Sequence, residues 1–327
     1  MQLPGNYNKS AKHVQSEFVT GCPVCGKYEF KKITSGYDFE LETCINEWFF
    51  YECEFCKCWI MNPRPCISEL SVIYPENYYS YSLSKTISPI ALKGKEILDN
   101  IKFKSILSAI GKEPKSYLDV GCGDGRYLKY FAKRGVDKNN IYGLELSQKT
   151  VDVLNSEGYK AFNETIDNCK SIPEGSIDLI TMFHVIEHMH NPREVLSIIH
   201  RLLSPSGILV IETPNTESCD TKLFQNHWWG GYHFPRHWVL FEHNSLKHLF
   251  TNTNYEIVDI KYQTGHSFWM YSFHHILKYN KYCKMEKISA CFDPMKGLLF
   301  LVLFTGIDFI RKLLKFKTSA IMVIGRK

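Results

Sequence analysis

The segment YLDVGCGDG, residues 117–125, restricts what this chain can fold into more than any other stretch. A strand-like run ends in glycines at alternate positions, and glycine tolerates positive φ and lets the backbone approach a ligand closely. A helix that begins after such a loop offers unpaired N–H groups to that ligand. The segment therefore predicts a nucleotide-binding loop of the form acid-x-Gly-x-Gly-x-Gly, built from Asp119, Gly121, Gly123 and Gly125.

Two common nucleotide loops do not fit this segment. The dinucleotide fingerprint needs a glycine at the sixth position counted from Gly121, where Arg126 stands, and the phosphate loop needs a Gly-Lys-Ser/Thr that does not follow. The remaining pattern resembles the first motif of the class I S-adenosylmethionine-dependent methyltransferases, which implies S-adenosylmethionine as the cofactor. Glu145 ends the next strand-like run, where an acid can bind both hydroxyls of a ribose. The same resemblance implies that Asn163 or Glu164 meets the adenine amino group.

Strand-like and helix-like segments alternate from residue 93 to the end of the chain. Strands are expected at 117–120, 141–146, 159–162, 177–183, 207–212, 255–260 and 319–325, and helices at 93–110, 127–134, 148–156, 193–203 and 245–250. Such alternation predicts right-handed βαβ units and a doubly wound, Rossmann-like α/β sheet. Ligands of these sheets bind at the carboxyl ends of the strands, where the glycine loop and Glu145 fall.

The run IDLITMFHVIEHMHNP, residues 177–192, resembles the fourth-strand motif of this methyltransferase superfamily. Its two histidines, His184 and His188, can frame the cofactor pocket through hydrogen bonds. Alternatively, one of them can act as a general base for an acceptor hydroxyl, because imidazole titrates near neutral pH. A further alternative, by similarity to an acid-rich triplet in quinone O-methyltransferases, is that His184, Glu187 and His188 hold a divalent cation.

An aromatic and histidine-rich stretch, HWWGGYHFPRHWVLF at 227–241, lies within an expected cap loop over 214–241. A loop after the fifth strand hangs over the pocket and can close on substrate, or it can simply pack against the open side of the cofactor. His237 is the first candidate for a catalytic base, since its loop lies where the acceptor should enter, and His233 is another. Arg236 can hold an anionic group such as a phosphate or a carboxylate.

Two Cys-x-x-Cys pairs stand near the amino terminus, at Cys22 and Cys25 and at Cys53 and Cys56. Two residues between paired cysteines let a tight turn aim both sulfurs at one ion, and four thiolates suit a structural Zn²⁺. In an alternative ligand set, Cys58 replaces Cys56. A module of this size needs a staple to fold, so we expect a zinc ribbon.

A zinc ribbon in front of a methyltransferase domain resembles an arrangement found in bacterial enzymes of glycan, lipid and natural-product pathways. The expected parts are a zinc ribbon with its linker over 17–75, a methyltransferase core over 76–265, and a hydrophobic helical insert with a last strand over 266–327. The ribbon is expected to dock a partner or to cap the substrate.

The C-terminal insert contains an apolar run of 11 residues, 297–307, with basic residues after it up to 317. This run is too short to span a bilayer, which needs roughly 20 residues. It can form a buried helix, a contact between two copies in a homodimer, or an interfacial anchor whose basic residues meet lipid headgroups. Peripheral membrane contact through 297–317 and a homodimer are therefore both open.

Composition and charge indicate which partners and which cellular compartment to expect. A net charge of +5, with few basic residues clustered in the ribbon, does not argue for nucleic acid. The Asn/Asp-Pro-Pro-Tyr motifs of base N-methylation are absent, which disfavours an RNA methyltransferase. Residues 1–16 are polar and show no apolar leader, so the twelve cysteines indicate a reducing, cytoplasmic compartment.

We therefore expect an enzyme that moves a methyl group from S-adenosylmethionine to a small-molecule acceptor. O-methylation of a sugar, lipid or secondary-metabolite intermediate is the preferred reaction. C-methylation of a deoxysugar nucleotide is an alternative, because zinc-bearing sugar C-methyltransferases also start with a cysteine-rich module. A non-catalytic nucleoside-binding scaffold is a third hypothesis, which the intact glycine motif and Glu145 oppose.

Overall fold

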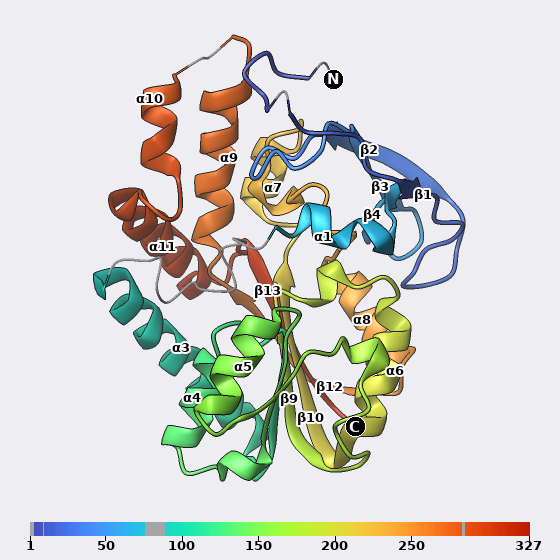
Figure 1. Ribbon diagram of the computed structural model, residues 1–327, viewed down its shortest axis with the longest axis vertical. Helices are drawn as coiled ribbons and strands as arrows, with labels where there is room; N and C mark the ends of the chain where they lie inside the picture. Colours follow the sequence, from blue (N-terminus) through green and yellow to red (C-terminus); the bar gives the residue numbers. More distant parts are fainter. Residues whose placement is uncertain (1–2, 9, 76–88, 283–284) are drawn as a thin grey trace.

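The computed structural model describes residues 3–8, 10–75, 89–282 and 285–327 of the chain. Figure 1 shows a central sheet with helices on both faces, and a smaller N-terminal module that lies beyond the carboxyl ends of the parallel strands. Residues 76–88, with which the predicted core domain begins, lie outside the described residues. The predicted domain boundaries stay predictions.

Seven strands form the central sheet in the order β12-β13-β10-β9-β6-β7-β8. The strands from β10 to β8 run parallel, whereas β13 is antiparallel to both of its neighbours. Their bounds are β6 Tyr117–Val120, β7 Ile141–Leu144, β8 Lys160–Phe162, β9 Ile177–Phe183, β10 Leu203–Pro214, β12 Glu256–Gln263 and β13 Ala320–Arg326. The predicted doubly wound α/β class is confirmed, and all seven expected strands form.

Helices cover both faces of this sheet: α3, α4 and α5 lie on one side, and α6 and α8 lie on the other (Figure 1). Their bounds are α3 Pro89–Ile110, α4 Arg126–Lys133, α5 Gln148–Ser156, α6 Pro192–Leu202 and α8 His243–Thr251. Ile208 and Val210 of β10 pack toward the first group, whereas Leu209 and Ile211 pack toward the second. The strand is apolar throughout because successive side chains point to opposite, equally covered faces.

The N-terminal module is built on a second sheet, in the order β11-β4-β3-β2. Its strands are β2 Phe30–Gly36, β3 Trp48–Cys53, β4 Trp59–Met61 and β11 Val239–Leu240, and a small pair joins β1 Ser16–Glu17 to β5 Arg64–Pro65. β11 comes from the cap, where Val239 pairs with Ile60 and Leu240 with Trp59. The cap is therefore more than a loop, because it adds a strand to the ribbon sheet and also contains α7 Cys219–Phe224.

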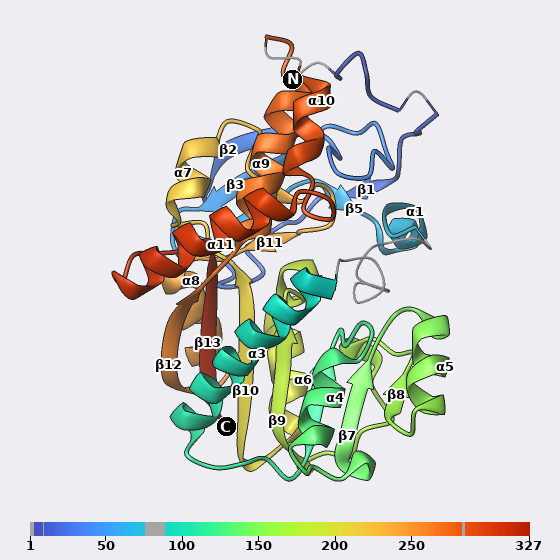
Figure 2. The same ribbon diagram turned by 90° about the vertical axis from the view of Figure 1, so that its left-hand side faces the viewer.

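The C-terminal insert forms α9 His266–Tyr279, α10 Glu286–Ser289 and α11 Leu298–Leu313. Short helical turns complete the described chain, namely α1 Leu70–Ile73, η1 Ile67–Glu69, η3 Lys138–Asn140, η4 Ile166–Asn168, η5 Ile186–His188, η6 Gly230–Tyr232 and η7 Ala290–Phe292. Within the described ranges, every helix is too short or too polar to traverse a lipid bilayer. Figure 2 shows α11 at the outer side of the molecule, beside α9.

Candidate functional site

The glycine loop after β6 has the backbone conformation that the sequence predicts. Gly121, Gly123 and Gly125 have φ values of 73°, 51° and 73°, in the left-handed region that favours glycine. A Cβ atom on Gly121 would lie 2.6 Å from Val185 Cγ2, and one on Gly125 would lie 2.3 Å from Leu154 Cδ2. Neighbouring side chains and the backbone therefore both exclude larger residues from these positions.

Glu145, just after β7, is held against this loop. One carboxylate oxygen accepts the Gly123 N–H at 2.9 Å, and the other accepts the Ser147 N–H at 3.0 Å. Burial raises the pKa of Glu145. The carboxylate thus stands beside the glycine loop at the carboxyl edge of the sheet, which is the position the sequence predicts for contact with a ribose.

Asp119, the acid of the glycine motif, lies beneath the loop rather than at its surface. Its carboxylate accepts the hydroxyl of Thr181 on β9 at 2.7 Å, and the residue is 2% exposed. Burial raises the pKa of Asp119 to about 7. This contact ties β6 to β9 directly below the predicted cofactor position.

Asn163 and Glu164, after β8, have partners within the chain. Asn163 Nδ2 donates to the carbonyl oxygens of Glu145 at 3.1 Å and Leu146 at 2.7 Å. Glu164 accepts the hydroxyl of Ser171 at 2.6 Å. Asn163 braces the loop around Glu145, whereas Glu164 braces the loop after β8. Contact of either side chain with adenine stays a prediction.

His184 follows β9 with a φ of 56°, a conformation that is uncommon outside glycine and that clusters at functional positions. Its ring lies between two carboxylates, with Nδ1 3.3 Å from Glu187 Oε1 and Nε2 3.5 Å from Glu212 Oε1. Burial alone would lower the pKa of His184, but the two carboxylates outweigh it and raise the pKa to about 9. The two carboxylates favour the protonated imidazole, and this disfavours His184 as a general base.

His188 and His237 share one tautomer. Nδ1 of His188 lies 2.9 Å from the Arg236 carbonyl oxygen, and Nδ1 of His237 lies 2.8 Å from the Gly231 carbonyl oxygen. Because a carbonyl only accepts, both Nδ1 atoms carry the hydrogen and both Nε2 atoms keep a lone pair. Burial lowers the pKa of His188 to about 4 and that of His237 well below its ordinary value. Each ring is therefore favoured in its neutral form and presents an Nε2 lone pair to a cation or to a proton donor.

Glu187 lies fully buried among these histidines. Oε2 accepts the Thr213 hydroxyl at 3.0 Å, and Oε1 lies 3.9 Å from His237 Nε2. Ligand atoms of Glu187, His188 and His237 lie within 4.8 Å of one another, so this trio could hold a metal ion. The sequence suggested His184 in place of His237. The cap supplies His237 instead, and both ring nitrogens of His184 face carboxylates.

Arg236 does not face an anionic ligand, because its guanidinium is taken up by a carboxylate of the chain itself. Its guanidinium donates to both carboxylate oxygens of Asp38, at 3.0 and 2.8 Å, and both side chains are fully buried. The neighbouring His233 likewise places Nδ1 2.7 Å from Glu40 Oε2. The N-terminal module thus anchors the cap and builds part of the wall around the histidines.

Sequence reasoning misses several residues of this wall, namely Lys102, Glu212, Tyr74 and Glu40. Lys102 Nζ lies 2.7 Å from Glu212 Oε2, and Tyr74 Oη lies 2.8 Å from His188 Nδ1. Glu212 carried a usable signal, because it stands in an apolar strand close to the carboxyl edge, as does the acid after β7. The other three carry no local motif, since only the tertiary fold brings them to the histidines.

The four predicted zinc ligands gather in the N-terminal module. Cys22 Sγ lies 3.5 Å from Cys56 Sγ, and Cys25 Sγ lies 3.5 Å from Cys53 Sγ. All four sulfur atoms lie within 4.8 Å of one another. Tetrahedral Zn²⁺ with bonds of about 2.3 Å needs sulfur atoms about 3.8 Å apart, so the cluster has the size of a zinc site.

Cys58, the alternative ligand, also lies close, with Sγ 3.3 Å from Cys22 Sγ. The two knuckles repeat one backbone pattern, in which Cys22 N–H donates to the Lys27 carbonyl at 2.8 Å and Cys53 N–H donates to the Cys58 carbonyl at 2.9 Å. Cys58 therefore occupies the place of Lys27, beyond the ligand positions of its knuckle. This repeat favours Cys56 as the fourth ligand.

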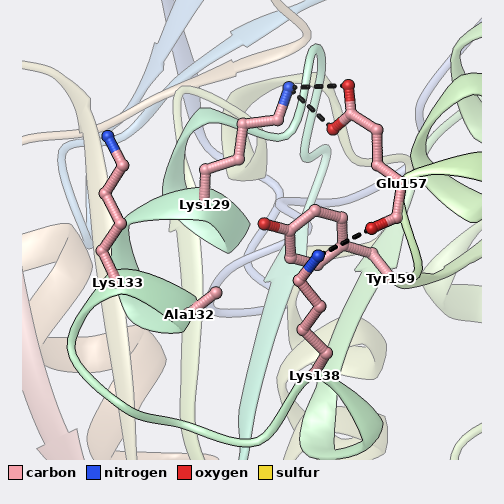
Figure 3. A pocket seen from close by; sticks show the side chains of 6 residues that line it. All are labelled: Lys129, Ala132, Lys133, Lys138, Glu157 and Tyr159. Carbon is pink, nitrogen blue, oxygen red and sulfur yellow. Dashed lines mark hydrogen bonds and ion pairs between the residues drawn. The ribbon is translucent and has the colours of Figure 1, made fainter.

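A surface hollow of about 540 Å³ lies away from these groups (Figure 3). Its lining residues are Lys129, Ala132, Lys133, Lys138, Glu157 and Tyr159. Lys129 forms an ion pair with Glu157 at 2.9 Å, and Lys138 Nζ donates to the Glu157 carbonyl at 2.7 Å. The lining lies where α4 and α5 lead into β7 and β8, which is the amino edge of the sheet, opposite the glycine loop.

Residues 93–260, about half of the chain, match the family model described as "Methyltransferase domain". A ubiquinone biosynthesis O-methyltransferase from Dechloromonas aromatica is 31% identical over 125 residues, which cover 36% of this chain and 52% of that protein. An uncharacterized protein from Haemophilus influenzae is 27% identical over 152 residues, which cover 44% of this chain and 58% of that protein. The chain thus spans about half the length of these curated relatives.

Among solved structures, the plantazolicin methyltransferase BamL, in complex with a triazolic desmethylPZN analog and SAH, is similar in fold. The match covers 80% of this chain and 94% of that chain, with a TM-score of 0.51 and 14% sequence identity. At this level of identity, the likeness concerns the fold alone.

Proposed function

The chain belongs to the methyltransferase domain family, and from that premise we propose that it transfers the methyl group of S-adenosylmethionine to a hydroxyl oxygen of a small acceptor. S-adenosylmethionine would bind at the glycine loop, with its ribose on Glu145. Zn²⁺ would be held by the four knuckle cysteines, Cys22, Cys25, Cys53 and Cys56, in a structural role.

The observation that carries this proposal is the contact between the glycine loop and the histidine segment. The position of a Cβ on Gly121 lies 2.6 Å from Val185 Cγ2, and Val185 directly follows His184. A donor bound at the loop therefore lies beside the segment that carries His188, and the cap brings His237 to the same place. His237 presents a buried Nε2 lone pair there, as a general base must.

The proposed step needs one proton transfer and one displacement. The acceptor hydroxyl gives its proton to Nε2 of His237 while an oxygen lone pair forms the bond to the methyl carbon. The carbon–sulfur bond breaks, and its electrons stay on sulfur, which leaves S-adenosylhomocysteine. The Glu187 carboxylate, 3.9 Å from Nε2, stabilises the imidazolium that forms. In-line positioning of the two substrates supplies the rest of the acceleration.

Oxygen is the preferred acceptor atom because the site offers a base, and because one relative with 31% identity is a ubiquinone biosynthesis O-methyltransferase. The test incubates the purified chain with methyl-labelled S-adenosylmethionine and a panel of catechols, hydroquinones and deoxysugar nucleotides. Mass spectrometry should find labelled methyl ethers. A label on carbon would favour C-methylation, and full cofactor binding with no labelled product from the panel or a cell extract would favour a scaffold.

The two roles considered for Glu187, His188 and His237, a general base or a cation site, predict different metal contents. If His237 acts as a base, the chain should carry about one metal ion, the zinc of the knuckles. Elemental analysis that finds two ions per chain, falling to one in His237→Asn, would instead favour a cation held by Glu187, His188 and His237.

A further inference from the structure

Helix α11 presents an apolar face to solvent. Leu299 and Leu313 are 77% and 67% exposed, and they stand at the two ends of the face. The other exposed apolar side chains of the helix and its end are Leu298, Val302, Leu303, Ile307, Phe309, Ile310, Leu314 and Phe316. Positions three and four apart share one side of a helix, so these side chains form a continuous strip along α11.

The polar groups of α11 point the other way. Asp308 is fully buried, where one carboxylate oxygen accepts the Gly265 N–H at 2.8 Å and the other accepts the Trp269 indole N–H at 3.3 Å. Arg311 donates to the same carboxylate at 2.7 Å. A helix on the surface of a protein surrounded only by water has the opposite arrangement, with its polar groups outward.

The charge around the strip is positive. Residues 296–317 contain Lys296, Arg311, Lys312, Lys315 and Lys317, and their one acid is the buried Asp308. Lys296 stands before the first turn of α11 and lies 3.7 Å from Asp293. Lys315 and Lys317 stand after the last turn, and Lys317 pairs with Glu217. All three lysines are exposed. An apolar strip with lysines at both ends complements a surface that is apolar inside and anionic at its boundary.

We propose that α11 docks this protein on the surface of an anionic lipid bilayer. The helix lies in the plane of the membrane, with its apolar strip at the boundary between headgroups and acyl chains and its lysines on lipid phosphates. The helix has 16 residues, about 24 Å, and is too short to cross the roughly 30 Å hydrocarbon core. A second copy is a poorer occupant, because two strips of this kind would bring lysines against lysines.

Docking at α11 would bring the membrane close to the candidate site. The Asp308 carboxylate holds Gly265, the residue before α9, and the ring of Phe268 on α9 lies 5.9 Å from the ring of His184. The buried side of α11, opposite the strip, is therefore connected through α9 to the histidine segment.

The test is flotation of the full chain with vesicles of phosphatidylcholine alone or mixed with phosphatidylglycerol. The chain should float with the anionic vesicles, and raised salt should weaken the binding. The variant Leu299→Ser/Val302→Ser/Ile310→Ser/Leu313→Ser should bind the vesicles at least about tenfold more weakly, since those side chains no longer enter the lipid. Phe18→Ser/Val153→Ser, which changes exposed apolar residues elsewhere, should bind like the parent chain.

Two outcomes would overturn the proposal. One is the absence of flotation with anionic vesicles although calorimetry shows that the chain binds S-adenosylmethionine and is therefore folded. The other is a dimer in solution, seen by light scattering, that the four-serine variant converts to a monomer while flotation stays unchanged. Neither readout depends on methyl transfer, so failure here leaves the proposed reaction untouched.

Discussion

The glycine loop and the histidine cluster lie at the same edge of one sheet, but the chain builds them in different ways. The loop and its acid come from one continuous segment, 117–145, in which the Gly121 and Gly123 N–H groups donate to the Leu144 carbonyl and to the Glu145 carboxylate. The cluster draws on the ends of β9 and β10, on the cap and on the N-terminal module. The donor half of the site is therefore a local structure, and the acceptor half is a product of tertiary folding.

This contrast predicts that the two halves can be damaged separately, and the zinc knuckles give the largest effect. Cys53→Ser should abolish zinc binding, because it removes one of the four thiolate ligands. The ribbon should then lose much of its stability, since structural zinc contributes on the order of 10 kcal/mol to folding. The ribbon sheet shares β11 with the cap, so the acceptor half should loosen and turnover should be lost. Elemental analysis, together with hydrogen exchange in β3, β4 and β11, measures both effects.

Affinity for S-adenosylmethionine should stay within about threefold in that variant, because the loop has its own backbone support. Cys219→Ser, at an exposed cysteine outside the knuckles, is the matched control and should keep its zinc. If zinc loss lowered the affinity for S-adenosylmethionine much more than threefold while hydrogen exchange in the ribbon rose, the two halves would not be separable.

His237→Asn probes the acceptor half alone. The Asn amide can still donate to the Gly231 carbonyl, as Nδ1 of His237 does, but it offers no basic nitrogen. Turnover should fall by roughly 10²–10⁴-fold while cofactor affinity stays nearly constant. Steady-state kinetics and calorimetry make the comparison, and a loss below about fivefold across the pH range would leave proximity as the source of catalysis.

Glu145→Gln probes the donor half. It keeps the size of the side chain and removes a charge that would strengthen bonds to ribose hydroxyls, so affinity for S-adenosylmethionine should fall by about 5–150-fold. Glu164→Gln is the control, since its carboxylate accepts the Ser171 hydroxyl, and we expect about twofold or less. Calorimetry that finds a larger effect at Glu164 would instead give that residue the contact with the cofactor.

His184 should produce the smallest effect, and one that depends on pH. Its pKa is raised to about 9, so the ion pairs with Glu187 and Glu212 stabilise the fold fully below about 6.5 and are lost as the pH rises through 9. The melting temperature of the parent chain should therefore fall by about 1–2 °C more than that of His184→Asn between pH 6.5 and 9.5, because the ring is partly exposed. Identical melting curves for the two chains would contradict this assignment.

The same contrast explains how much could be predicted from the sequence. The order of strands and helices, the glycine loop and the position of Glu145 follow from local periodicity and spacing, and the four cysteines follow from the geometry of a tight turn. The partner of Arg236 could not be inferred, because Asp38 stands far from it in the chain. Lys102 and Glu40 likewise become site residues only through packing, which a single sequence does not encode in any short pattern.

The buried pair of Asp38 and Arg236 has a consequence for how such chains can be recombined. The two residues stand 198 positions apart, yet removal of either would leave an uncompensated charge in the interior, at a cost of several kcal/mol. A chimera that joins this ribbon to the cap of another family member would contain such an uncompensated charge unless that cap also had an arginine at the position of Arg236. We expect the ribbon and the cap to be exchanged between lineages together, although they are two separate segments of the sequence.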